Sequence, residues 1–107
     1  MPYRPSKAMR DNARKALEYR KTLPPSQRYG TPVGLARARD IARGVRLSRE
    51  TIVRMRSFLA RHRANAERQR DAGEYGRARG AYDLWGGFEA INWVEDKIRR
   101  YKRAGEM

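Results

Sequence analysis

The chain contains no cysteine, which excludes a disulfide framework, a thiolate metal site and thiol redox chemistry. No apolar run approaches the roughly 20 residues that a membrane span requires. Residues 1–10 also lack the apolar stretch of a secretory signal. We therefore expect a soluble protein with no membrane partner, which stays in the compartment where it is made.

Groups suited to catalysis are scarce. His62 is the only histidine, so it has neither a cysteine nor a second histidine with which to hold a metal ion. It follows Ile52, Met55 and Leu59 at helical spacing, which predicts a hydrogen-bonded residue at the edge of the core. No base and orienting acid can be assigned to any serine. The sequence therefore predicts no enzyme, no metal, no cofactor and no small-molecule substrate.

Large aliphatic residues are few, and a mean hydropathy of −1.00 approaches the composition of disordered chains. Two Trp, six Tyr and two Phe can nevertheless anchor a small core. We expect a single helical domain over residues 1–107, with loose ends at residues 1–5 and 104–107.

Helix signals recur along the chain, and no segment alternates with the period of a strand. Three residues are typical N-caps: Ser6, Thr31 and Ser48. Three sites are typical helix stops: Pro24-Pro25, Gly44 and Gly86-Gly87. The pattern predicts an all-α fold, a compact bundle of about five short helices with no sheet.

Positive charge dominates the composition, because 26 Lys+Arg against 12 Asp+Glu give a net charge of +14. Most of these cations are arginines, whose planar group binds phosphate bidentately and stacks on bases. Such a surface attracts polyanions before any specific contact forms. Two other interpretations stay open: the arginine usage can reflect a GC-rich genome, and a charged helix face can serve solubility alone.

Residues 40–52 have the rhythm of a helix, a glycine turn and an arginine-bearing second helix, as in a DNA-binding helix-turn-helix. An ordinary helical corner competes with this interpretation, because Asp40 replaces the usual small residue and the turn from Gly44 to Ser48 is long. The candidate nucleic-acid-binding residues lie at this corner, on the third helix and at the end of the fifth: Arg46, Arg49, Arg54, Arg56, Arg61, Arg63, Arg99, Arg100, Lys102 and Arg103.

Residues 81–96 depart from the positive charge, because this window holds four carboxylates and both tryptophans but no Lys or Arg. One interpretation makes Trp85 and Trp93 core anchors, since Gly86-Gly87 permits a sharp reversal of the chain. The other makes the window an exposed contact patch for a protein partner, with the candidate residues Trp85, Phe88, Glu89 and Trp93.

Several strings resemble a small domain that recurs in tailed-phage and prophage proteins. They are Thr31-Pro32-Val33-Gly34-Leu35-Ala36-Arg37, Ser57-Phe58-x-x-Arg61-His62 and Leu84-Trp85-Gly86-Gly87. The resemblance covers most of residues 5–94, and the chain departs from it at residues 29–30 and 88–90. It implies a viral protein, located in the cytoplasm of the infected bacterial host or in the virion, and it brings no catalytic residue.

Two functions are compatible with these features. The first is a small basic phage protein that binds DNA or another polyanion through Arg-rich helices, mostly without sequence specificity. The second is a protein-interaction module, a virion component or an inhibitor of a host protein, which uses the corner from Trp85 to Asp96 to contact a phage or host protein. The sequence does not distinguish DNA from RNA, because no paired aromatic platform at recognisable spacing appears.

Overall fold

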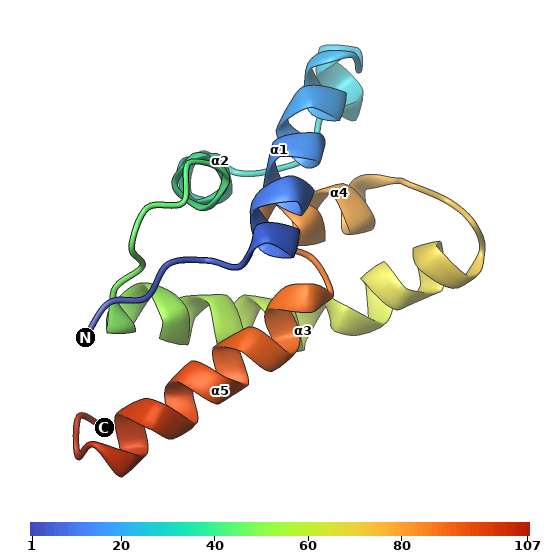
Figure 1. Cartoon of the computed structure of the whole chain (residues 1–107). Helices are drawn as coiled ribbons and strands as arrows, with labels where there is room; N and C mark the ends of the chain where they lie inside the picture. The colour runs from blue at the N-terminus through green and yellow to red at the C-terminus, as the bar shows by residue number, and fades with distance from the viewer.

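The computed structural model describes all 107 residues, and it is all-α, as the sequence predicts. The α-helices are α1 (Lys7–Lys21), α2 (Pro32–Ala42), α3 (Arg49–Asp71), α4 (Arg77–Leu84) and α5 (Glu89–Arg103) (Figure 1). A short 3₁₀ turn, Pro25–Gln27, follows α1. The only β-type pairing is an isolated bridge between Tyr3 and Leu47.

Local signals determine where the first three helices begin. The predicted N-caps are confirmed, because each side-chain oxygen accepts the backbone N–H three residues further on: Ser6 from Met9, Thr31 from Gly34 and Ser48 from Thr51. Each bond provides a partner for an amide that has none within the first helical turn.

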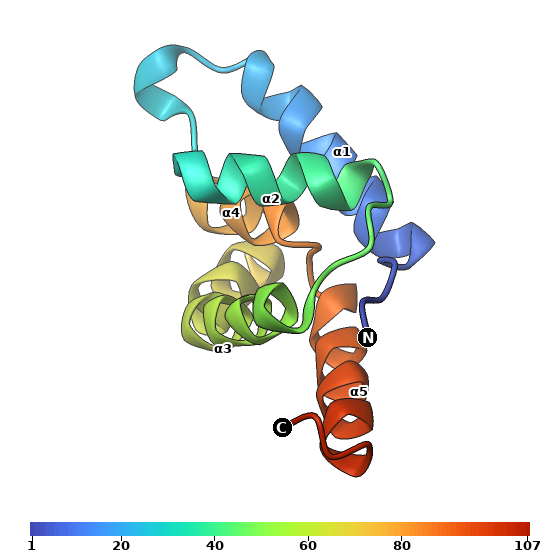
Figure 2. The ribbon, with the colours of Figure 1, turned by 90° about the vertical axis from the view of Figure 1, so that its left-hand side faces the viewer.

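The helices pack in two groups. α2 and α4 both pack against α1, while α3 packs against α4 on one side and α5 on the other (Figures 1 and 2). α5 extends away from the body, which gives overall dimensions of 45 × 26 × 21 Å. Because α2 lies on α1 and α4 and not along α3, residues 40–52 form a corner between the groups. They do not form the packed helix pair of a helix-turn-helix.

The core lies between the two groups. α1 contributes Met9, Ala13 and Ala16, and further core residues come from every other helix: Ile41, Ile52, Met55, Leu59, Tyr82, Leu84, Val94, Ile98 and Tyr101. The predicted position of His62 is wrong, because its side chain is exposed and the buried face of α3 continues at Ala66 instead.

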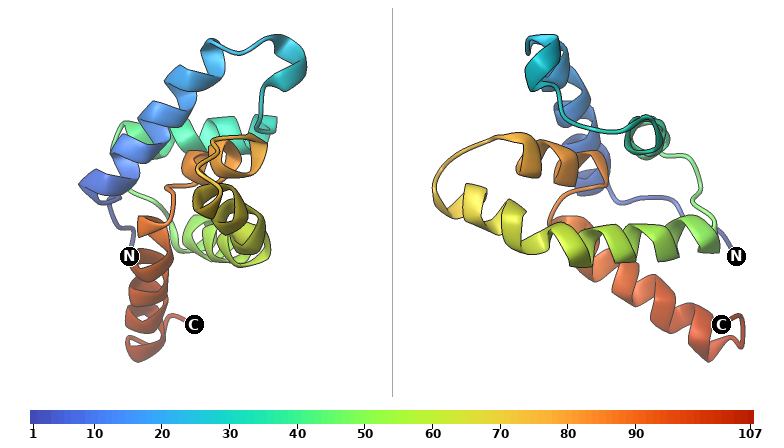
Figure 3. Two further views of the ribbon diagram at one scale, coloured as in Figure 1. Left: turned by 90° about the vertical axis from the view of Figure 1, so that its right-hand side faces the viewer. Right: turned by 180° about the vertical axis from the view of Figure 1, so that it is seen from behind.

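Both ends of the chain, which we expect to be loose, make contacts with each other. The Met1 amino group lies 2.8 Å from Glu106 Oε1. The Tyr3 and Tyr101 rings meet edge to face, with their centroids 5.5 Å apart. The termini accordingly lie on the same side of the molecule, near the start of α3 (Figure 3).

Candidate nucleic-acid interface

The arginines of α3 lie in two rows along the helix, because positions seven apart occupy nearly the same face. One row consists of Arg54, Arg61 and Arg68, and the other of Arg49, Arg56, Arg63 and Arg70. All of these side chains are exposed. The two rows differ in whether a carboxylate neutralises them.

Every member of the second row has a carboxylate partner, and we call this the paired row. Its shortest contacts to each carboxylate are Arg49 Nη2 to Glu50 Oε1 at 3.3 Å, Arg56 Nε to Glu95 Oε1 at 2.8 Å, Arg63 Nε to Glu67 Oε2 at 3.2 Å and Arg70 Nε to Asp71 Oδ1 at 3.1 Å. The Arg56 contact is the one that links α3 to α5. The charge of this row is therefore largely compensated.

The members of the other row have no carboxylate within ion-pair distance, and we call this the free row. Arg68 donates a hydrogen bond to Asn65 Oδ1, which carries no charge. Neither Arg54 nor Arg61 makes an ion pair or a hydrogen bond within the chain. From Arg54 to Arg68 the row extends about 21 Å along the helix axis.

The remaining candidate cations are divided in the same way. Asp96 lies 3.9 Å from Arg99 and 3.0 Å from Arg100. Hydrogen bonds from Lys97, foremost, and from Arg100 hold the pKa of the Asp96 carboxyl below its usual value. In contrast, three candidates have no carboxylate partner: Arg46, Lys102 and Arg103.

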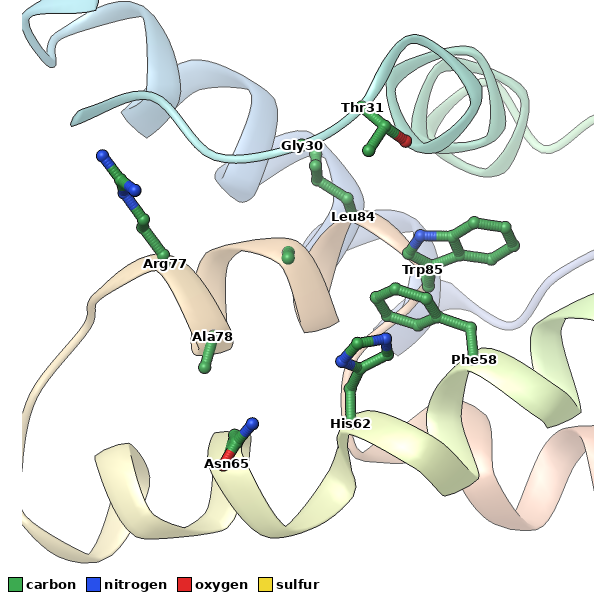
Figure 4. A pocket seen from close by; sticks show the side chains of 10 residues that line it. Gly30, Thr31, Phe58, His62, Asn65, Arg77, Ala78, Leu84 and Trp85 are labelled. Carbon is green, nitrogen blue, oxygen red and sulfur yellow. The ribbon is translucent and has the colours of Figure 1, made fainter. Parts of the chain in front are cut away.

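A groove runs beside the free row and consists of two adjoining hollows. The hollow between α3 and α4, which we call the α3–α4 pocket, has a volume of about 340 Å³ (Figure 4). Its lining is Gly30, Thr31, Phe58, His62, Asn65, Arg77, Ala78, Ala81, Leu84 and Trp85. The second hollow, of about 440 Å³, lies between the start of α2 and α3, and Arg54 and Arg61 line it. No Asp or Glu lines either hollow.

Three rings form a ladder in this groove. The Phe58 ring stacks on the Trp85 indole with centroids 4.7 Å apart and an interplanar angle of 16°. On its other side, Phe58 lies 4.4 Å from the His62 ring. The ladder therefore leads from the buried Trp85 through the half-buried Phe58 to the exposed His62.

The reversal after Trp85 holds that side chain in place. Gly86 and Gly87 have φ of +104° and +77°, which side chains rarely adopt. A Cβ on Gly87 would lie only 2.4 Å from Asn12 Nδ2 of α1. Asn12 Nδ2 itself donates to the Gly86 carbonyl oxygen at 2.9 Å. The double glycine thus lets Asn12 of α1 approach closely and hydrogen-bond the turn that follows Trp85.

Asp83, two residues before Trp85, is a nearly buried carboxylate, with 6% of its surface exposed. The Tyr75 hydroxyl donates to Asp83 Oδ2 at 2.6 Å, and Lys15 Nζ lies 3.8 Å from the same oxygen. Burial raises the pKa of the Asp83 carboxyl and outweighs both partners, which act in the opposite direction. The carboxylate therefore belongs to the packing of α4 on α1 and not to the groove.

The four candidate partner-binding residues do not gather into one exposed patch. Trp85 is only 7% exposed, in agreement with its interpretation as a core anchor. Phe88 and Trp93 are half-buried, with the Arg70 guanidinium and the Lys97 ammonium over their rings. Glu89 accepts a hydrogen bond from Asn12 at 2.6 Å.

The candidate residues predicted from the sequence do not include Arg68, Asn65 and Arg77. Arg68 was detectable, since it stands seven residues after Arg61 and fourteen after Arg54. Asn65 and Arg77 carried no such signal, because they come to line the same pocket only in the folded chain.

No protein-family model, curated protein or solved structure matches this chain. The resemblance to the phage domain therefore stays a prediction. No helix has both the length and the apolar character that crossing a membrane takes.

Proposed function

We propose that this protein binds nucleic acid through the free row of α3, mostly without sequence specificity. The observation that carries the proposal is the separation of the arginines into two rows, one neutralised by carboxylates and one not. With a net charge of +14, the molecule attracts a polyanion from any direction. The free row provides a defined binding surface for that polyanion.

Phosphate is the ligand that best fits an exposed, unpaired arginine. A guanidinium in the free row can bind a phosphate bidentately without first leaving a carboxylate. Neighbours in the row are about 10.5 Å apart along the helix axis, so each guanidinium can contact a different phosphate. Phosphate contacts carry no sequence information directly, which is why we propose non-specific binding.

Salt-dependent binding to random-sequence DNA tests the proposal. The test variant is the double substitution Arg54→Gln/Arg61→Gln, and the matched control is Arg56→Gln/Arg63→Gln. Both remove the same charge from the same helix. Fluorescence anisotropy with a labelled duplex at 50 to 200 mM salt yields the slope of log K against log salt, and circular dichroism checks that both variants fold.

Each phosphate contact contributes about 0.9 to this slope on duplex DNA. We therefore expect the free-row variant to flatten the slope by about 1.8 and to weaken binding at 50 mM salt, while the paired-row control changes it by less than half as much. Equal losses in the two variants would mean that net charge alone governs binding. No binding of the wild-type protein at 50 mM salt would refute the proposal outright.

The resemblance to phage domains adds a location to the proposal. On that basis the nucleic acid is encountered in the cytoplasm of an infected bacterial host or in the virion. The proposal includes no chemical step, since the groove holds no arrangement of nucleophile, base and orienting acid.

A further inference from the structure

The α3–α4 pocket lies next to the free row, and its shape and chemistry differ from those of a phosphate site. Apolar groups form most of its wall, among them the Phe58 and Trp85 rings and the Leu84 side chain. Polar groups stand at separate points around it, including the Asn65 amide and the nitrogens of the His62 ring. A planar ligand with apolar faces and polar edges matches this distribution.

The aromatic ladder supports the same kind of ligand. His62 ends the ladder as an exposed ring, although its spacing predicted a residue at the edge of the core. Aromatic side chains that bind single strands are partly exposed in this manner, because each base stacks on a ring face. Figure 4 shows His62 and Phe58 projecting from α3 toward Trp85 along one wall of the pocket.

The surrounding charge indicates what the planar ligand is attached to. Arg77 stands at one end of the groove and Arg54 and Arg61 at the other, while no carboxylate lines either hollow. An apolar or basic peptide side chain would gain little from this excess of cations. A nucleobase on a phosphate backbone uses both features, because the base occupies the apolar pocket and its phosphates lie against the arginines.

We infer that the α3–α4 pocket accepts one unpaired base of a single-stranded nucleic acid whose backbone follows Arg54 and Arg61. This inference rests on the proposed function and adds a preference for single strands. A base within a duplex is stacked and paired on both sides, so it reaches the pocket only after extrusion, which costs free energy. Duplex DNA then binds through phosphates alone.

Three labelled 15-mers separate base recognition from charge: oligothymidylate, an abasic oligomer with the same backbone, and a duplex. Stacking of a single base predicts that the wild-type protein binds oligothymidylate about 5- to 150-fold more tightly than the abasic oligomer. Equal affinity for oligothymidylate and the abasic oligomer would overturn the inference and leave the proposed function intact. Failure to bind any of them would overturn both.

A pocket-filling variant makes the test specific to this site. Ala78 lines the pocket from α4, and Ala78→Leu fills part of it without changing any charge. We expect this variant to lose at least fivefold in affinity for oligothymidylate and to bind the abasic oligomer like the wild type. His62→Ala, at an exposed position, is the second variant and should show the same selective loss. Undiminished base preference in His62→Ala and in a folded Ala78→Leu protein would overturn the assignment.

Fluorescence provides a readout inside the pocket. In a Trp93→Phe background, Trp85 is the only tryptophan, and it is one wall of the pocket. A base that enters should change its emission, while the abasic oligomer should not. Identical responses to the two oligomers would place the bases elsewhere and overturn the inference.

Discussion

Replacing Gly80 by alanine should destabilise the protein although Gly80 lies within a helix, where alanine is normally favoured. Tyr29 is 4% exposed and packs directly over this position. A Cβ on Gly80 would lie 2.4 Å from two atoms of the Tyr29 ring and 2.6 Å from a third. Ordinary contact begins near 3.4 Å, so α4 and the ring must separate by about 1 Å.

The Tyr29 ring has little freedom to move away. Its hydroxyl donates to the Ala16 carbonyl oxygen of α1 at 2.6 Å, and its own carbonyl oxygen accepts from Arg20 Nε at 2.6 Å. Overpacking of this kind costs about 1–3 kcal/mol. Loss of the hydroxyl hydrogen bond adds about 1 kcal/mol, and the gain in helix propensity returns about 1 kcal/mol.

We therefore expect Gly80→Ala to lower the free energy of unfolding by about 1–3 kcal/mol, measured by urea titration with far-UV circular dichroism. The midpoint of thermal unfolding should fall by at least about 4 °C. Gly34→Ala is the matched control, because Gly34 is also helical but an added Cβ comes no closer than 3.3 Å to its neighbours. In a Tyr29→Leu background the cost of Gly80→Ala should largely disappear. A Gly80→Ala protein as stable as the wild type would refute the packing of α4 on Tyr29.

Two further substitutions test features of the fold. Asp83→Asn should remove a pH dependence of the free energy of unfolding. Because the pKa of Asp83 is raised, the folded state holds the proton more tightly than the unfolded state does. The stability of the wild type therefore falls as pH rises from about 3.8 through the folded-state pKa. Urea titrations from pH 4 to 7 should show the variant gaining stability relative to the wild type as pH rises, and a constant difference would contradict this. Ser48→Ala should cost about 1 kcal/mol through loss of the Thr51 N–H bond, with DNA affinity unchanged, and an unaltered urea midpoint would exclude the cap.

The helices were predictable from the sequence because their signals are local. Ser6 caps α1 within one turn, and Gly86-Gly87 ends the run of α4, whatever the rest of the chain does. The position of His62 was not predictable from its spacing. Its spacing after Ile52, Met55 and Leu59 predicts a position at the edge of the core. In the fold α3 and α4 leave the α3–α4 pocket open there, and His62 lines it as an exposed side chain.

The candidate site was predictable only as a set of cations and not as a surface. Arg54 and Arg56 look alike in the sequence, since both are arginines two positions apart on one predicted helix. Both are also exposed in the fold. Their difference comes from Glu95, which is 39 residues away from Arg56 along the chain and 2.8 Å away in the fold. Long-range pairing of this kind has no sequence signal without the arrangement of α3 against α5.

The stretch without Lys or Arg contributes to the difference between the two rows, although Glu50, Glu67 and Asp71 of α3 itself compensate the other three arginines of the paired row. Residues 81–96 lack cations because much of the stretch is interior: Tyr82, Leu84 and Val94 are buried there. Two of its four carboxylates emerge beside α3 and α5, where Glu95 meets Arg56 of the paired row and Asp96 meets the arginines of α5. The other two, Asp83 and Glu89, contact α1. None of the four reaches a residue of the free row. The stretch thus adds one carboxylate to the paired row and none to the free row, which leaves Arg54 and Arg61 for an anionic partner.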